Sequence, residues 1–172
     1  MTYISEPVDI PLTGAESFDS GVPSLDDWLR STSVTMEKAN MGRTFVWRDG
    51  EAVVAYYHLA PHELGQEGIP SRDRFAKKNR PVPSFLIAKL ALSKTLQGRG
   101  LGAALLYDAL VRIVAAASQV GGRLVIVDAI DERAAGFYGA HGFKEVRVEH
   151  PDRPRRFFRS ISSIVEDMDE SA

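Results

Sequence analysis

The chain has 172 residues, the usual size of one domain, and its 44% hydrophobic and 26% charged residues are ordinary for a soluble globular protein. It contains no cysteine, which excludes disulfides, thiolate metal sites and a cysteine nucleophile. The first residues lack a basic region followed by an apolar stretch, and no apolar run approaches the roughly 20 residues that a membrane span needs. We therefore expect a cytoplasmic protein that is neither secreted nor inserted into a membrane.

The first half of the chain is predicted to form strands around one helix. In chain order we expect a short edge strand over 3–10 and a helix over 24–38 with Ser24 as its N-cap. Two strands over 43–47 and 52–60 follow, and then an irregular polar stretch over 62–81. The two strands are joined by Arg48-Asp49-Gly50, in which Asp-Gly is a strong signal for a hairpin turn.

The second half alternates strands and helices. An apolar run over 83–92 has the length and density of a central strand, and a glycine-rich turn leads from it into a long helix that ends at Gly121-Gly122. There follow a buried strand over 123–127 and a helix over 128–141 that is closed by Gly142. Residues 144–148 and 156–161 are expected to form a closing strand pair. Together, the predicted strands and helices indicate a mixed α/β fold with one domain over 1–163. Residues 164–172 are acidic and nearly devoid of large apolar groups, which predicts a disordered tail.

The net charge of -2 is unevenly distributed along the chain. The tail is acidic, whereas two internal segments are basic. The first basic segment carries Arg72, Arg74, Lys77, Lys78 and Arg80, and the second carries Arg153, Arg155, Arg156 and Arg159. Either segment is a candidate for binding a polyanion, although charge runs are more often solvated loops.

The turn Gln97-Gly98-Arg99-Gly100-Leu101-Gly102 has the features of an anion-binding site. Its glycines leave successive backbone N–H groups unobstructed at the N-terminus of the following helix, and the Arg99 guanidinium favours a di-anionic group such as a pyrophosphate. Glycines alone are a weak indication, because they also occur in turns that bind nothing. The chain has no Gly-Lys-Ser/Thr of a P-loop, and no acidic residue lies about 20 positions further on, which disfavours nucleoside-triphosphate and nicotinamide enzymes.

The order and spacing of these elements resemble the GNAT superfamily of N-acetyltransferases. The strand ending in Leu90-Ala91-Leu92, the turn with its Gln/Arg-x-x-Gly-x-Gly/Ala signature, the strand over 124–127 and the segment AAGFYGAHGF over 134–143 carry this resemblance. It implies a twisted mixed sheet, flanked by helices, in which two parallel central strands splay apart. It also implies acetyl-CoA as the cofactor, bound by Leu90, Ala91, Leu92, Gln97, Gly98, Arg99, Gly100, Leu101, Gly102, Ala103 and Phe137.

The same resemblance gives Tyr138 the role of the catalytic general acid. Acetyl transfer to an amine needs a neutral nucleophile, stabilisation of the oxyanion, and a proton for the departing thiolate, which a phenol can donate. Outside this context, Phe137-Tyr138 would be interpreted as core packing. By the same analogy, a backbone N–H near Leu90 stabilises the oxyanion. No metal site is predicted, because the four histidines have no spacing typical of metal ligands.

Segments outside this core narrow the resemblance to one branch. FDSGVPSLDDWLR over 18–30, RTFVW over 43–47 and VVAYYHLA over 53–60 are similar to the acetyltransferase toxins of bacterial toxin–antitoxin pairs, which acetylate the amino acid on charged tRNA. This implies an aminoacyl-tRNA substrate, a ribbon-helix-helix antitoxin and a homodimer. It also gives a purpose to basic residues that could contact RNA, namely Arg72, Arg74, Lys77, Lys78, Arg80 and Lys89. The toxins commonly have Leu-Gly-Arg-Leu-Ala where this chain has Ile-Ala-Lys-Leu-Ala over 87–91, which puts contacts near Lys89 in doubt.

Two alternatives remain open on the sequence alone. One is a housekeeping acetyltransferase for a small amine, such as a polyamine, an antibiotic or a free amino acid. The other is a non-catalytic acyl-CoA sensor or interaction module on the same fold. The presence of Tyr138 and of the intact turn disfavours this alternative.

Overall fold

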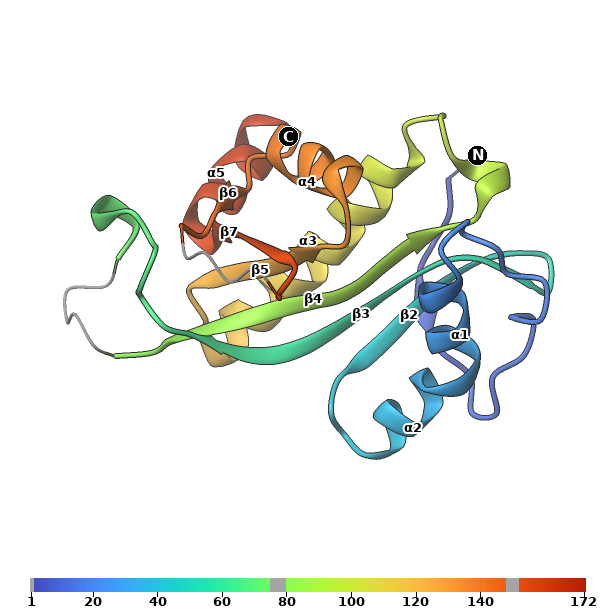
Figure 1. Ribbon diagram of the computed structural model, residues 1–172. Coiled ribbons are helices and arrows are strands. Elements are labelled where there is room, and N and C mark those ends of the chain that lie inside the picture. Colours follow the sequence, from blue (N-terminus) through green and yellow to red (C-terminus); the bar gives the residue numbers. More distant parts are fainter. Residues whose placement is uncertain (1, 75–79, 148–151) are drawn as a thin grey trace. The chain divides into compact units, whose positions relative to one another are not determined.

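The computed structural model describes residues 2–74, 80–147 and 152–172. The chain divides into two compact units, the first made of residues 1–60 and 87–109 and the second of 61–86 and 110–172. Figure 1 shows the helices and strands, coloured along the sequence. The predicted α/β class is confirmed, since helices and strands occur in both units.

The helices and strands lie close to their predicted positions. The helices are α1 (Pro23–Ser31), α2 (Ser33–Lys38), α3 (Leu101–Val120), α4 (Glu132–Ala140) and α5 (Ile161–Glu170), with 3-10 helices η1 (Ser71–Asp73) and η2 (Lys94–Leu96). The strands are β1 (Glu6–Pro7), β2 (Arg43–Asp49), β3 (Ala52–Leu64), β4 (Val82–Leu92), β5 (Leu124–Ala129), β6 (Lys144–Glu145) and β7 (Arg155–Ser160). β3 continues to Leu64, so the first residues of the stretch predicted to be irregular are a strand, whereas residues 75–79 lie outside the described residues.

In the first unit the strands follow the order β1-β2-β3-β4. β2 and β3 form the predicted antiparallel hairpin, in which Asp49 pairs with Ala52 and Gly50 takes a left-handed φ of 60° at the tip. Residues from β2, β3, β4 and α1, and from the segment between β1 and α1, form the core of this unit: Val8, Ala15, Phe18, Leu29, Val46, Val53, Tyr56 and Ala91.

The single helix predicted over 24–38 is in fact two helices. The chain breaks at Thr32, whose φ of -120° and ψ of -31° end α1 before α2 begins. The prediction of Ser24 as the N-cap is also wrong, because Pro23 begins the helix and Val22 is its N-cap. Proline suits the first helical position, where its fixed φ is already helical and its missing N–H is not needed.

The second unit orders its strands β5-β7-β6. β7 pairs antiparallel with both neighbours, so the predicted closing strand pair is confirmed, with Lys144 opposite Phe158. α4 begins later than predicted because β5 extends to Ala129, and the Asp131 side chain caps the helix by accepting from the Ala134 N–H at 2.8 Å. The core of this unit contains Leu64, Ile69, Val82, Leu124, Ile126 and Phe158.

The C-terminal residues form a helix, so the predicted disordered tail over 164–172 is corrected. α5 runs from Ile161 to Glu170, and the Ser160 hydroxyl caps it by accepting from the Ser163 N–H at 3.2 Å. Ile164 is only 1% exposed. The helix forms because four apolar residues recur at helical spacing among the acids: Ile161, Ile164, Val165 and Met168.

The long helix α3 is apolar and also ends as predicted, at Gly121 with a left-handed φ of 80°. Among the described helices it is the one long and apolar enough to cross a membrane, by length and composition alone. One of its faces is buried as in the core helix of a globular protein, with Leu105, Leu106, Ala109, Leu110 and Ile113 at most 5% exposed.

Candidate functional site

The glycine-rich turn lies between η2 and α3 and has the conformation of an anion cradle. Gly98 and Gly100 take left-handed φ values of 76° and 75°. No heavy atom lies within 4 Å of where a Cβ would be on either glycine, so backbone conformation rather than crowding requires them. Among the described residues, the N–H groups of Gly98, Arg99 and Gly100 form no main-chain hydrogen bond. Together with the start of α3 they are available to a ligand anion.

The Gln97 side chain holds this turn in place. Its Nε2 donates to the carbonyl oxygens of Leu92 and Ser20, both at 2.8 Å. Beside it, Lys94 pairs with Asp19 at 3.1 Å. The amide group of Gln97 thus fixes the turn to the end of β4 and to the segment before α1.

The other residues predicted to bind the cofactor in the first unit flank the turn. On β4, Ala91 is buried, whereas Leu90 and Leu92 are half-buried. Three half-buried residues form the first turn of α3, namely Leu101, Gly102 and Ala103. The structure therefore places all of the predicted cofactor residues except Phe137 along one continuous path of the first unit, from β4 through the turn into α3.

The N-terminal residues that narrowed the resemblance form an aromatic cluster in the first unit. The Trp28 ring is parallel to the Tyr56 ring at 5.9 Å and meets the His58 ring edge-on at 4.8 Å. The Lys89 Nζ lies 5.7 Å from the Trp28 ring centroid, as a cation–π contact. Burial, with a smaller contribution from the Lys89 charge, lowers the pKa of His58 to about 4, so this histidine is a neutral core residue that bonds Thr44 Oγ1 at 2.8 Å.

Tyr138 lies on α4 in the second unit and is 7% exposed. The rings of Phe137 and Phe143 pack edge-on against it at 5.4 and 5.7 Å. Burial raises the pKa of Tyr138 to about 12, and the Asp128 carboxylate acts in the same direction. Its hydroxyl has no hydrogen-bond partner in the part of the chain that the structure describes. Tyr138 is therefore a protonated phenol whose hydroxyl is available to donate to a ligand.

A polar cluster next to this tyrosine was missed by the sequence analysis. Arg156 on β7 binds Asp128 on β5 through two hydrogen bonds, of 2.8 and 2.9 Å, and its Nη1 lies 3.1 Å from His62 Nε2. Burial and the positive charge of Arg156 lower the pKa of His62, so a neutral ring accepts from the guanidinium. No signal in the sequence identifies this cluster, because it depends on the register of the two strands, which places Asp128 opposite Arg156.

The arginines of the second basic segment, a candidate for either a polyanion-binding segment or a solvated loop, mostly form ion pairs with carboxylates of the protein. Arg155 pairs with Glu132 at 2.8 Å and with Glu145 at 2.7 Å, and Arg156 pairs with Asp128. Arg159 binds Asp167 of α5. Three of the four arginines are thus already neutralised by carboxylates.

The described arginines of the first basic segment are exposed to solvent. They are Arg72, Arg74 and Arg80, and Arg74 donates from Nε to the Ile69 carbonyl at 2.6 Å. Lys77 and Lys78, which were predicted to contact RNA, lie outside the described residues. No group of three His, Asp or Glu side chains that could hold a metal ion occurs within residues 2–74, 80–147 and 152–172.

Comparisons with known proteins agree with this geometry. The acetyltransferase (GNAT) domain family matches residues 40–145. A tRNA-acetylating toxin of Mycobacterium tuberculosis is 42% identical over 123 residues, which cover 71% of this chain and 73% of that protein. The structure of the toxin AtaT with acetyl-methionyl-tRNAfMet is 23% identical and has a TM-score of 0.85, covering 97% of this chain and 99% of AtaT.

A mutant of AtaT bound to acetyl-CoA and to the C-terminus of the antitoxin AtaR is likewise 23% identical, with a TM-score of 0.79 over 96% of this chain and 98% of that one. These structures have the same fold as this chain. The family match and the 42% identity settle its membership. The chain belongs to the GNAT acetyltransferase family, in the branch of the tRNA-acetylating toxins.

Proposed function

We propose that the protein transfers the acetyl group of acetyl-CoA to the amino group of an aminoacyl-tRNA and so blocks translation as a toxin. The observation that carries this proposal is the 42% identity to a tRNA-acetylating toxin. The binding of acetyl-CoA and of an acetylated aminoacyl-tRNA by AtaT supports the same reaction. The family match over 40–145 runs through both units, which supports one catalytic domain over 1–163.

Separate groups of residues bind the cofactor and take part in acetyl transfer in the proposed reaction. The open N–H groups of the turn from Gln97 to Gly102 bind the pyrophosphate, and Leu90, Ala91 and Leu92 line the pantetheine. Acetyl-CoA supplies an activated acetyl thioester. As the amine forms a C–N bond to the acetyl carbon and the C–S bond breaks, Tyr138 donates its proton to the leaving sulfur, and the proton lost by the amine nitrogen restores the phenol. A backbone N–H near Leu90 stabilises the oxyanion.

The proposed RNA contacts are electrostatic. The exposed guanidinium groups of the first basic segment suit the phosphates of an acceptor stem, and binding through them weakens as salt rises. The residues proposed to contact RNA are Arg72, Arg74, Lys77, Lys78, Arg80 and Lys89. We further propose a cytoplasmic homodimer that is neutralised by a ribbon-helix-helix antitoxin, because AtaT is bound by the antitoxin AtaR.

The decisive experiment offers the enzyme a choice of acceptors. The protein is incubated with labelled acetyl-CoA, total charged tRNA and a panel of polyamines, aminoglycosides and free amino acids. We expect label in the tRNA fraction alone, released by mild alkali as an N-acetyl amino acid. Label in a small amine would establish a housekeeping acetyltransferase instead, and binding without transfer would establish an acyl-CoA sensor.

Replacing Gly100 with alanine is expected to weaken acetyl-CoA binding about tenfold. A side chain at a left-handed φ of 75° is strained by about 1–2 kcal/mol, which the turn relieves by rotating its N–H groups out of the cradle. Gly50→Ala is the matched control, since Gly50 has a φ of 60° in open space at the hairpin tip. Calorimetric titration should show the affinity loss for Gly100→Ala only. Equal affinities of both variants for acetyl-CoA would remove the turn from the cofactor site.

A further inference from the structure

Asp26 on α1 is a buried carboxylate to which the proposed acetyl transfer gives no role. The residue is 5% exposed, whereas the side chain of the next residue, Asp27, is 75% exposed and pairs with Arg30 at 3.2 Å. An acid in the first turns of a helix is normally satisfied by solvent and by the helix dipole. Burying a carboxylate costs free energy unless it accepts hydrogen bonds, so the partners of Asp26 indicate its role.

Asp26 holds Ser20 in the segment before α1. Its Oδ1 accepts from the Ser20 hydroxyl at 2.6 Å and from the Ser20 N–H at 3.0 Å. Ser20 is itself buried, and its Oγ accepts at 3.2 Å from the N–H of Val22, the N-cap of α1. One carboxylate thus fixes both the side chain and the main chain of Ser20, and with them the direction of the Ser20 carbonyl.

The Ser20 carbonyl extends this network to the glycine-rich turn. It accepts from Gln97 Nε2 at 2.8 Å, and the same amide group donates to the Leu92 carbonyl at 2.8 Å. Because both N–H bonds of the amide are used, the Gln97 side chain is held in one orientation. The neighbour of Ser20 also contacts η2, since the Asp19 carbonyl accepts from the Lys94 N–H at 2.9 Å.

The helix that carries Asp26 is firmly attached to the first unit. Leu29 is fully buried in the core, and the Tyr56 hydroxyl on β3 donates to the Leu25 carbonyl at 2.7 Å. The Trp28 ring lies parallel to the Tyr56 ring. Asp26 therefore projects from a rigid element, and its position determines that of Ser20.

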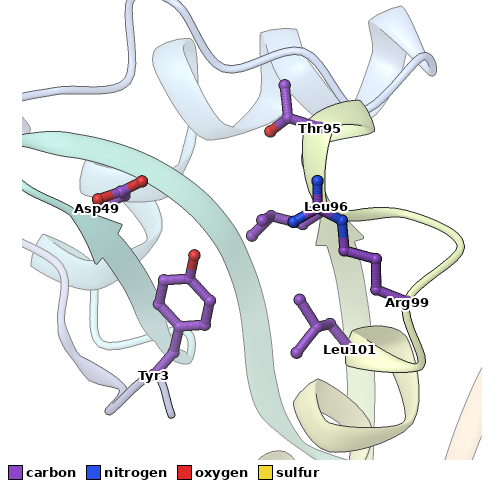
Figure 2. A pocket seen from close by; sticks show the side chains of 6 residues that line it. All are labelled: Tyr3, Asp49, Thr95, Leu96, Arg99 and Leu101. Carbon is purple, nitrogen blue, oxygen red and sulfur yellow. The ribbon is translucent and has the colours of Figure 1, made fainter. Parts of the chain in front are cut away.

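The network reaches the turn from outside the cavity that lies beside it. This cavity has a volume of about 540 Å³ and lies in the first unit, next to the Arg99 side chain (Figure 2). Its lining residues are Tyr3, Asp49, Thr95, Leu96, Arg99 and Leu101. Asp26, Ser20 and Gln97 are not among these described residues. They act on the turn through its backbone and not by touching a ligand in the cavity.

We propose that Asp26 is a positioning residue, which through Ser20 and Gln97 couples the helix α1 to the conformation of the glycine-rich turn. This inference rests on the proposed function, in which the turn binds acetyl-CoA. The left-handed glycines Gly98 and Gly100 give the turn a mobile backbone, so its N–H groups converge only while Gln97 is held. Because coupling between two sites is reciprocal, bound acetyl-CoA must in return stabilise α1.

The first test compares the acetyl-CoA affinities of matched variants by calorimetric titration. We expect Asp26→Ala to weaken binding about tenfold, the effect of losing a charged hydrogen bond, and to raise the KM for acetyl-CoA with the turnover number unchanged. Asp26→Asn should bind nearly as the wild type does, because its Oδ1 still accepts both hydrogen bonds. Asp27→Ala is the matched control, since Asp27 is an exposed carboxylate in the same helix. A merely structural role would lower the melting temperature without separating KM from turnover.

Hydrogen exchange provides a second measurement, which for the wild type does not depend on the folding of a variant. Saturating acetyl-CoA should slow amide exchange about tenfold over residues 23–31, the range of α1, because the coupling acts equally in both directions. The same addition should leave α1 unchanged in Asp26→Ala.

Each alternative outcome has a distinct meaning. Equal affinities of Asp26→Ala and Asp27→Ala for acetyl-CoA would overturn the inference, and so would wild-type exchange over 23–31 that does not respond to acetyl-CoA. In either case, labelled acetyl on tRNA in the same preparation would show that the proposed function stands without it. A wild-type protein that binds no acetyl-CoA would overturn the proposed function and the inference together.

Discussion

Replacing Tyr138 with phenylalanine is expected to lower the turnover number about 10²- to 10⁴-fold, with the affinity for acetyl-CoA little changed. The substitution removes only the hydroxyl and keeps the ring that packs between Phe137 and Phe143. The fold and the cofactor turn therefore remain, and the loss reports proton donation alone. Single-turnover transfer of labelled acetyl to charged tRNA measures the rate, and calorimetric titration measures the affinity.

The pH dependence of the wild-type enzyme provides a second test of this role. Because burial raises the pKa of Tyr138 to about 12, the phenol keeps its proton throughout the range in which the protein is assayed. The turnover number should consequently not fall through deprotonation of Tyr138 between about pH 7 and pH 10. For the Tyr138→Phe substitution, Tyr107→Phe is the matched control, since Tyr107 is 53% exposed on α3 and its hydroxyl should not be needed for turnover. Near-wild-type turnover of Tyr138→Phe would assign the proton to another group.

Features set by local sequence were predictable. The apolar run of β4, the turn after it and the helix α3 follow one another in sequence, and glycine marks most points where the backbone is left-handed, as at Gly98, Gly121 and Gly142, with Asn40 as an exception. The hairpin tip at Gly50 followed from the same rule. The candidate cofactor turn is such a local feature, so its residues could be named before the fold was known.

Features that depend on pairing between distant residues were not predictable. Arg155 and Arg156 looked like free cations in the sequence, because their carboxylate partners Glu132 and Asp128 lie more than 20 positions earlier. The cavity likewise brings together Tyr3, Asp49 and Arg99 from three parts of the chain. The register of β5 and β7 brings Asp128 to Arg156, whereas the other contacts depend on how α4, the hairpin and the loops pack in three dimensions, and a single sequence gives neither.

The C-terminal helix shows a different limit of sequence analysis. Its acidic composition predicted disorder, yet Ile164 is buried and α5 is anchored by Arg159 at the end of β7. The Arg159 side chain is 11% exposed. It donates to the Ser163 hydroxyl and carbonyl oxygens, at 3.1 and 3.3 Å, and binds the Asp167 carboxylate. It also donates to the His141 carbonyl at 3.2 Å, which ties α5 to the C-terminal end of α4.

Replacing Arg159 with methionine should therefore lower the free energy of unfolding by about 2 kcal/mol, because the variant leaves partly buried carbonyl groups without the charged donor that satisfied them. Asp167→Asn should cost at most about 1 kcal/mol, since the Asp167 side chain is 65% exposed and solvent replaces its partner. Urea unfolding monitored by circular dichroism gives both values if the slope is unchanged.

The comparison of the two variants distinguishes the guanidinium's contacts with backbone from its ion pair. A Cβ on Gly142 would lie 3.1 Å from the Arg159 Cζ, so the guanidinium packs closely on the residue that closes α4. If the two variants lose equal stability, the ion pair anchors α5 and the backbone contacts do not. If Arg159→Met loses more, as we expect, α5 is secured through the end of α4, the helix that carries Tyr138.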